Sequence, residues 1–127
     1  MPATKLIFFR EADGTAPVVE WLTQLRRKNP RAYAKCRVRL MRLAEMGHEL
    51  RRPEADYLRD GIYELRSRLG SVNYRVLYFF HGRNVAIVAH GLTKEDEVPN
   101  REIEQAIKRR TAFLASPTEH SFTGDVS

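Results

Sequence analysis

The sequence GIYELRSRLGSVNYR, residues 61–75, decides how we interpret the fold of this chain. Its two halves alternate like β-strands, and the small residues Gly70 and Ser71 between them predict a tight hairpin turn. Arginines interrupt both predicted strands, two before the turn and one after it: Arg66, Arg68 and Arg75. Because a guanidinium group binds phosphate in bidentate geometry and keeps its proton, arginines on neighbouring strands indicate a phosphate-binding surface, most simply one for nucleic acid.

Further strands extend this hairpin into a sheet. The hairpin itself predicts a strand over residues 62–69 and another over residues 72–80, which are rich in β-branched and aromatic side chains. The sequence HGRN at residues 81–84 predicts a second hairpin turn, and a third strand over residues 85–92 follows it. Residues 5–10, KLIFFR, predict a further strand, which we expect at an edge of the sheet.

Three helices are predicted from apolar residues at helical spacing. The first covers residues 17–28, and the second starts at Pro30, with Asn29 as its N-cap and Gly47 as its C-cap. The third starts at Pro99. Residues 48–59 have no clear period and contain a proline, so we interpret them as a loop.

The resulting order of elements is β-α-α-β-β-β-α. It predicts an α+β domain with a small antiparallel sheet, an N-terminal helical hairpin and a C-terminal helix, with the helices packed on one face of the sheet. We expect a single domain over residues 1–115. The polar residues 116–127 are interpreted as a flexible C-terminal tail.

Composition limits the classes of function. The chain has 127 residues and a hydrophobic fraction of 43%, which suits one soluble domain. It has no apolar segment long enough to span a membrane and no signal peptide, so cytoplasmic residence is expected. The single cysteine, Cys36, excludes an internal disulfide and is expected in the core, and the four histidines lack ligand spacing, so neither a metal nor another cofactor is expected.

Charge points to an acidic partner. The net charge is +6, and arginines outnumber lysines by 17 to 5. This excess favours planar, bidentate recognition. A basic domain of this kind attracts nucleic acid, an acidic protein, or both, whereas no segment has the strongly amphipathic pattern of a membrane-surface helix.

Three segments carry a resemblance to a known family: GIYELR (61–66), YRVLYFF (74–80) and HGLTKEDEVPNREIEQA (90–106). Together they resemble the RelE/ParE superfamily of toxins from type II toxin–antitoxin modules, with the closest likeness to the phage-related HigB-like branch. The resemblance implies a RelE-like fold and a metal-independent mRNA endonuclease that acts on the translating ribosome. In such enzymes the 2′-hydroxyl of the RNA attacks the adjacent phosphorus.

The resemblance also implies roles for individual residues. Arg66 and Arg75 match the strand arginines of the family and would hold the scissile phosphate. Lys94 matches the first of two lysines that commonly follow the last strand. Here the acidic residues 95–97 follow it instead, and such a run weakens the positive field beside an RNA site.

Proton transfer needs groups other than arginine, which cannot act as a base near neutral pH. Because histidine titrates in the useful range and His90 lies near Lys94, we prefer His90 as the catalytic acid or base. The other side chains of suitable chemistry are His81, Tyr74, Tyr78 and Glu64.

A second basic surface is predicted on the second helix. Its polar face carries Arg31, Lys35, Arg39 and Arg42. We interpret Lys35, Arg39 and Arg42, with Arg68 of the first hairpin, as RNA-binding residues. The helix face could equally be a solvated surface, or receive an acidic segment of the antitoxin.

The resemblance implies partners as well. These are mRNA, the ribosome and a cognate antitoxin, which in the HigB branch usually carries a helix-turn-helix domain and is HigA-like. Operator DNA would be bound only through that antitoxin. Two alternatives remain open: a ParE-like toxin that poisons DNA gyrase by protein contact, and a nucleic-acid-binding domain of the same fold with weak or no catalytic activity.

Overall fold

The structure, a computed structural model, describes residues 3–94 and 97–123, except for the side chain of Lys94. It is an α+β fold with a five-stranded sheet and three helices, which confirms the predicted fold class. The elements in chain order are β1 (Lys5–Phe8), α1 (Pro17–Lys28), α2 (Pro30–Met46), the short 3₁₀ helix η1 (Gly47–Glu49), β2 (Ala55–Arg59), β3 (Ile62–Leu69), β4 (Val72–Phe80), β5 (Val85–Lys94) and α3 (Asn100–Ala115).

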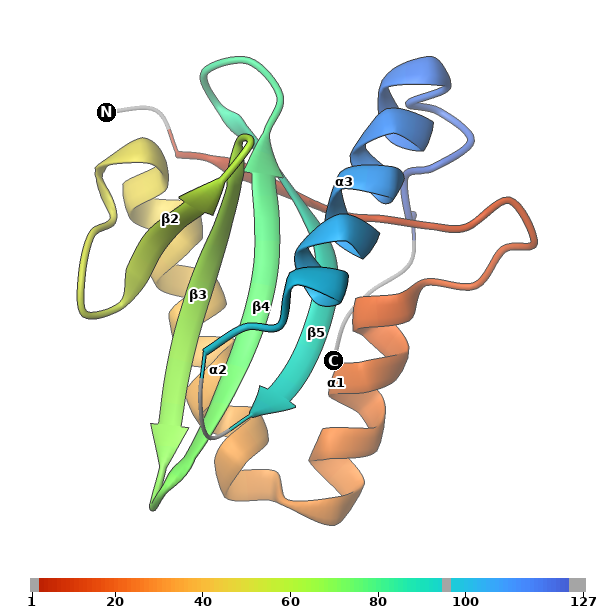
Figure 1. Cartoon of the computed structure of the whole chain (residues 1–127). Helices are drawn as coiled ribbons and strands as arrows, with labels where there is room; N and C mark the ends of the chain where they lie inside the picture. The colour runs from red at the N-terminus through yellow and green to blue at the C-terminus, as the bar shows by residue number, and fades with distance from the viewer. Residues whose placement is uncertain (1–2, 95–96, 124–127) are drawn as a thin grey trace.

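The sheet has the strand order β1-β5-β4-β3-β2 (Figure 1). The four strands β2 to β5 form an antiparallel meander, and β1 pairs in parallel with β5 at one edge. The predicted edge position of the first strand is therefore confirmed. The turn between β3 and β4 is also confirmed at Gly70 and Ser71, where Gly70 has a φ of 63°, a conformation that favours glycine.

The strand β2 corrects the sequence prediction, which treated residues 48–59 as a loop. These residues contain η1 and then β2, which pairs with β3 at the second edge of the sheet. The sequence of β2, ADYLR, is short and mostly polar, as expected for an edge strand that faces solvent. Its pairing with β3 gives it a strand conformation that its own composition does not predict.

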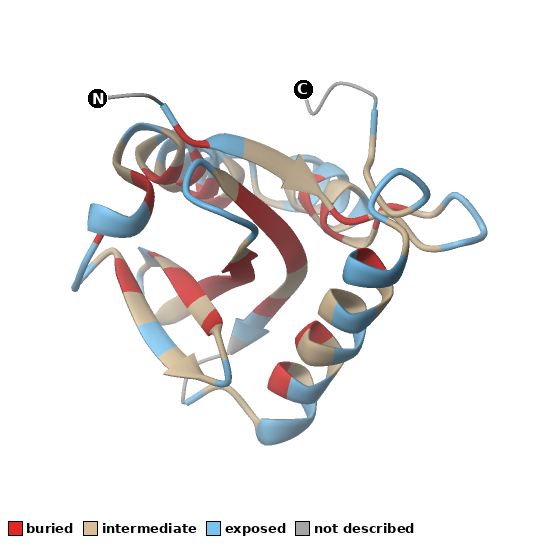
Figure 2. Cartoon of the chain, turned by 90° about the horizontal axis from the view of Figure 1, so that it is seen from above, coloured by how far each residue is buried: buried red, intermediate tan, exposed pale blue. Residues whose placement is uncertain are grey.

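The helices cover both faces of the sheet, which corrects the prediction that they pack on one face. The helices α1 and α2 pack on the face that carries Tyr74, Val76 and Tyr78 of β4. The helix α3 packs on the opposite face, against Leu77 and Phe79. Figure 2 shows the strands between α3 and the other two helices. The strand β4 is apolar on both faces because both faces are covered.

Local chemistry explains the ends of α2. The side chain of Asn29 accepts a hydrogen bond from the backbone N–H of Ala32, and Pro30 begins the helix, as predicted. Gly47 ends it with a φ of 52°, and a Cβ atom at this position would clash with the hydroxyl of Thr4. Cys36, within α2, is buried as predicted, and burial raises the pKa of its thiol to about 11.

The segment after α3 packs against the edge strand β1. His120 stacks on Phe9 with ring centroids 5.2 Å apart, and its backbone C=O accepts a hydrogen bond from the N–H of Arg10. Phe122 donates its backbone N–H to Phe8. The open edge of β1 supplies these backbone partners, residues 124–127 lie outside the described part, and the flexible C-terminal tail stays a prediction. None of the described helices is long and apolar enough to cross a lipid bilayer.

Candidate nucleic-acid interface

The two strand arginines of the predicted site are brought together by the β3–β4 hairpin. Arg66 lies directly opposite Arg75 in the register of the two strands, so their side chains share one face of the sheet. Both line a cleft of about 390 Å³ between the sheet and the start of α3. We call this cleft the arginine cleft; its charged lining residues are Asp56, Arg59, Glu64, Arg66, Arg75 and Glu97.

Arg75 is buried and ion-paired. Its side chain is 9% exposed and donates to the carboxylate of Glu64, whose side chain is 5% exposed. A buried guanidinium needs such a partner because desolvation of an uncompensated charge is costly. Glu64, one of the acid–base residues considered from the sequence, thus lies in the cleft but is bound to Arg75.

Arg66 has fewer protein partners than Arg75. Its Nε atom is buried without a hydrogen-bond partner, and within the described residues its side chain forms no ion pair. The positive charge of Arg66 also acts on Asp56. The pKa of Asp56 is lowered mainly by the hydrogen bond from Arg52, and to a smaller extent by the charge of Arg66. A buried N–H group without a partner is the feature expected where an anionic ligand completes a site.

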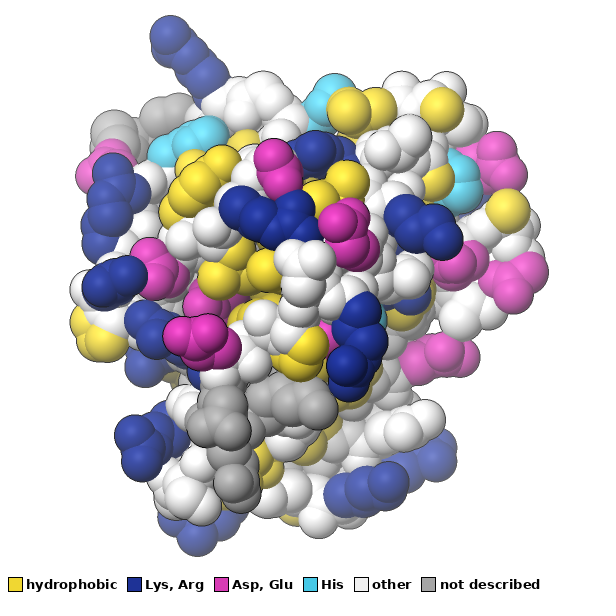
Figure 3. Space-filling model, viewed as in Figure 1, with side chains coloured by type: hydrophobic (Ala, Val, Ile, Leu, Met, Phe, Trp, Pro, Cys, Tyr) yellow, Lys and Arg dark blue, Asp and Glu magenta, His cyan; other side chains and the backbone are white. Residues whose placement is uncertain are grey.

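The charges of the arginine cleft nearly cancel. Its lining includes three arginines and three carboxylates. Arg59 is held by the carboxylates of Asp60 and Glu104 and by Asn100. Figure 3, which views the face covered by α3, shows basic and acidic side chains interspersed across it. Specificity for a phosphate must therefore come from the geometry of individual arginines rather than from a broad positive field.

His90 lies outside the lining of the cleft, held by α3. Its Nε2 atom is 2.9 Å from a carboxylate oxygen of Glu102, and its Nδ1 atom is 2.8 Å from a guanidinium nitrogen of Arg109. Since arginine can only donate, Nδ1 accepts and Nε2 carries the proton that is donated to Glu102. Both ring nitrogens are therefore engaged in the structure described.

The other acid–base residues considered from the sequence lie elsewhere. Tyr74 and Tyr78 are buried on the opposite face, and burial raises the pKa of Tyr78. His81 lies in the exposed turn before β5 and contacts the ring of Phe113. Of the five side chains proposed for proton transfer, Glu64 alone lines the arginine cleft.

The position of Lys94 is described for its backbone only. This residue ends β5 and pairs with Asn73 of β4. Of the acidic run that follows it, Glu95 and Asp96 lie outside the described residues, whereas Glu97 is exposed and lines the arginine cleft. The acidic residues that follow Lys94 therefore place at least one carboxylate, that of Glu97, in the lining of the cleft, as expected from their position next to Lys94 in the sequence.

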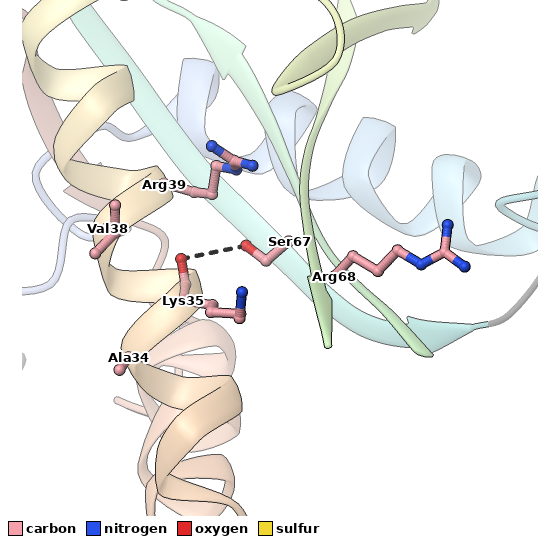
Figure 4. A pocket seen from close by; sticks show the side chains of 6 residues that line it. All are labelled: Ala34, Lys35, Val38, Arg39, Ser67 and Arg68. Atoms are coloured by element: carbon pink, nitrogen blue, oxygen red, sulfur yellow. Dashed lines mark hydrogen bonds between the residues drawn. The ribbon is translucent and has the colours of Figure 1, made fainter. Parts of the chain in front are cut away.

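The predicted RNA-binding residues divide between the two faces of the sheet. Lys35, Arg39 and Arg68 line a pocket of about 350 Å³ between α2 and the end of β3. In Figure 4 the side chain of Arg68 extends away from α2, and the hydroxyl of Ser67 reaches the backbone oxygen of Lys35. Lys35 and Arg39 belong to α2 and lie on the opposite face of the sheet from the arginine cleft, whereas Arg68 follows Arg66 by two residues in β3 and shares its face.

Two of these residues have a structural partner. Arg39 and Arg42 both bind the carboxylate of Glu54, which precedes β2, at distances of 2.9 and 3.0 Å. Arg39 also donates to the backbone oxygen of Arg66. These bonds attach α2 to the edge of the sheet that carries the arginine cleft.

A family model covers most of this structure. The model described as Phage derived protein Gp49-like matches residues 20–111. The chain belongs to this Gp49-like family. It is a family of RelE-like toxins from toxin–antitoxin systems, and a toxin of this kind has an antitoxin as its partner. A comparison with curated proteins finds no match.

The Gp49-like match includes residues that sequence reasoning missed. Asp56, Tyr57 and Arg59 line the arginine cleft, and all three belong to β2. They were missed because this segment was interpreted as a loop. The available signal was Tyr57, an aromatic residue of a type enriched in strands; the structure shows its side chain 53% exposed.

Proposed function

We propose that this chain is the toxin of a type II toxin–antitoxin module of the HigB-like branch, and that it cleaves mRNA on the translating ribosome without a metal ion. The observation that carries the proposal is the pairing of Arg66 with Arg75 in one open cleft, where the Nε atom of Arg66 lacks a partner. Membership of a RelE-like toxin family supports it. The cognate antitoxin would be HigA-like, with a helix-turn-helix domain.

The proposed reaction is a transfer within the RNA. The 2′-hydroxyl oxygen bonds to the adjacent phosphorus, the bond from phosphorus to the 5′ oxygen breaks, and a cyclic phosphate and a 5′-hydroxyl result. One proton leaves the 2′-hydroxyl and one reaches the departing 5′ oxygen. Arg66 and Arg75, assisted by Lys94, would bind the phosphate oxygens and stabilise the charge that develops on them, typically a large part of catalysis.

The two nearest acid–base groups each require a rearrangement. For His90 to transfer a proton, Glu102 or Arg109 must first release one of its ring nitrogens. Glu64 already lines the cleft but must part from Arg75. An RNA phosphate bound to Arg75 would compete with Glu64 for the guanidinium group and so favour this second route.

Expression of the chain in growing cells tests the proposed function. We expect growth arrest, together with new 5′ ends on mRNA that depend on ribosome occupancy and are mapped by primer extension. Arg66→Ala should abolish both effects while the soluble protein still accumulates. Co-expression of the antitoxin encoded beside the toxin should restore growth.

The carboxylates of the cleft favour a second function. Glu64, Asp56 and Glu97 offset the arginines, an arrangement that suits a ParE-like toxin acting on gyrase by protein contact. Growth arrest without new 5′ ends on mRNA would support that function and contradict the nuclease. A chain that neither arrests growth nor cleaves RNA would be a weakly active or inactive nucleic-acid-binding domain of this fold.

A further inference from the structure

A second groove borders the arginine cleft at the edge strand β2. It has a volume of about 570 Å³ and lies between η1, the loop after η1, and the strands β2 and β3. We call it the aromatic groove; the lining residues used below are His48, Arg51, Arg52, Asp56, Tyr57 and Tyr63. None of these residues has a role in the mRNA cleavage proposed above.

The wall of this groove is a row of ring contacts that joins two exposed side chains, His48 and Tyr57, through the partly buried rings of Phe80 and Tyr63. His48 stacks on Phe80 with centroids 3.6 Å apart, and Phe80 meets Tyr63 edge to face at 5.3 Å. Tyr63 in turn meets Tyr57 at 5.1 Å. Tyr57 ends the row at 53% exposure, and its hydroxyl accepts a hydrogen bond from the backbone N–H of Gly61. An exposed ring held in this way is a rigid surface on which a planar base can stack.

The rim of the groove is cationic. Arg51 is exposed and donates to the backbone oxygens of His48 and Leu50, which directs its side chain along η1. Arg52 is 76% exposed and pairs with Asp56 at 2.8 Å, so the negative charge of Asp56 is balanced on this side. Aromatic rings with arginines at their edge are the combination that binds single-stranded nucleic acid.

The aromatic groove and the arginine cleft meet at the edge strand β2. Asp56 and Tyr57 line both, the cleft on the face covered by α3 and the groove on the face covered by α2, so a strand that leaves Arg66 reaches the ring of Tyr57 by passing over this edge of the sheet. We propose that the aromatic groove binds the nucleotide adjacent to the scissile phosphate, with its base stacked on Tyr57 and its phosphate bound by Arg51 and Arg52. This inference rests on the proposed function. The lining shared with the cleft at β2 favours RNA as the occupant over a segment of a partner protein.

Fluorescence anisotropy with a labelled nine-nucleotide RNA, 2′-O-methylated so that it cannot be cleaved, tests the groove. We expect Tyr57→Ala to weaken binding by about tenfold, in the range for loss of one stacked base. Tyr57→Phe, which keeps the ring and loses the hydroxyl, should retain most of the affinity. Leu114→Ala removes a side chain of similar exposure (54%) on α3 and serves as the matched control.

Arg51→Gln should also weaken binding and reduce its salt dependence, whereas Arg83→Gln, in the exposed turn before β5, should not. Circular dichroism melts of each variant establish that it is folded.

The outcomes separate the two proposals. If the RNA binds and Arg66→Ala weakens it, but Tyr57→Ala does not, the inference about the groove is wrong and the proposed function stands. If the RNA does not bind, or Arg66→Ala has no effect, the proposed function fails and the groove proposal fails with it. If Tyr57→Ala lowers affinity for the antitoxin and not for RNA, the groove is a protein interface, which also overturns the inference.

Discussion

At the scale of single residues, the decisive contrast is between Arg66 and Arg75. The two-residue turn at Gly70 and Ser71 places them opposite each other, so their common face follows from the sequence alone. The sequence does not reveal that the two arginines differ in their ion-pair partners. Arg75 is buried and paired with Glu64, whereas Arg66 is only partly buried, and burial depends on how distant segments pack.

This burial yields a prediction for stability. Arg75→Met leaves Glu64 as a buried charge without its partner, and we expect a loss of about 3–5 kcal/mol in the free energy of unfolding. Arg75→Met combined with Glu64→Leu removes both charges and should recover a large part of that loss. Denaturant unfolding of the two single variants and the double variant measures the coupling. Strictly additive losses would mean that the pair is not the interaction that holds Arg75.

Loss of toxicity in an Arg75 variant could therefore result either from loss of stability or from loss of phosphate binding. Arg66 is the cleaner position for activity because its side chain forms no ion pair among the described residues.

At the scale of elements, predictability follows from local periodicity. The helices α1 and α2 were predicted with their ends because proline, asparagine and glycine occupy the cap positions. The strand β2 was not, because a short polar edge strand acquires its conformation from pairing with β3. The apolar run at residues 76–80 did carry a signal for helices on both faces, since a strand covered on one side alternates with polar residues.

Glu54 connects two of these elements and gives a pH prediction. Its pKa is lowered from the ordinary 4.5, first by the hydrogen bond from Arg42. A carboxyl group whose pKa falls on folding stabilises the protein above its unfolded pKa, and this contribution is lost as the pH falls through the folded pKa. Glu54→Gln should lower Tm by a few degrees at neutral pH and have little effect near pH 2.

Thermal melts across pH measure this effect. Glu119→Gln, at an exposed position, is the control. An equal loss of stability at both pH values would show that the charge of Glu54 is not responsible.

At the scale of the whole molecule, the net charge of +6 and the composition predicted an anionic partner but not its location. The arginines are distributed over both faces of the sheet, and several are bound to carboxylates. Sequence spacing placed Lys35, Arg39 and Arg42 on one helix face, yet Glu54, distant in the chain, engages two of them. The sequence could not reveal this ion pairing because it depends on tertiary packing.

Salt dependence tests how many phosphates the molecule contacts. If Arg66, Arg75 and Lys94 together bind the scissile phosphate, and Arg51 and Arg52 bind the adjacent one, log K for single-stranded RNA should fall with log salt concentration with a slope of about −1.4, about −0.7 for each phosphate. Arg66→Ala should weaken binding and reduce the size of the slope by at most about 0.7. Arg83→Ala, in the exposed turn, should leave it unchanged. Binding that is insensitive to salt would exclude a phosphate-reading site.

The most direct test of the account is single-turnover cleavage of ribosome-bound mRNA by purified wild-type and Arg66→Ala proteins. The account predicts cleavage that leaves a cyclic phosphate and a 5′-hydroxyl, and a rate about 100- to 1,000-fold lower for Arg66→Ala, with an unchanged melting temperature. A folded Arg66→Ala protein that cleaves the mRNA at the wild-type rate would contradict it.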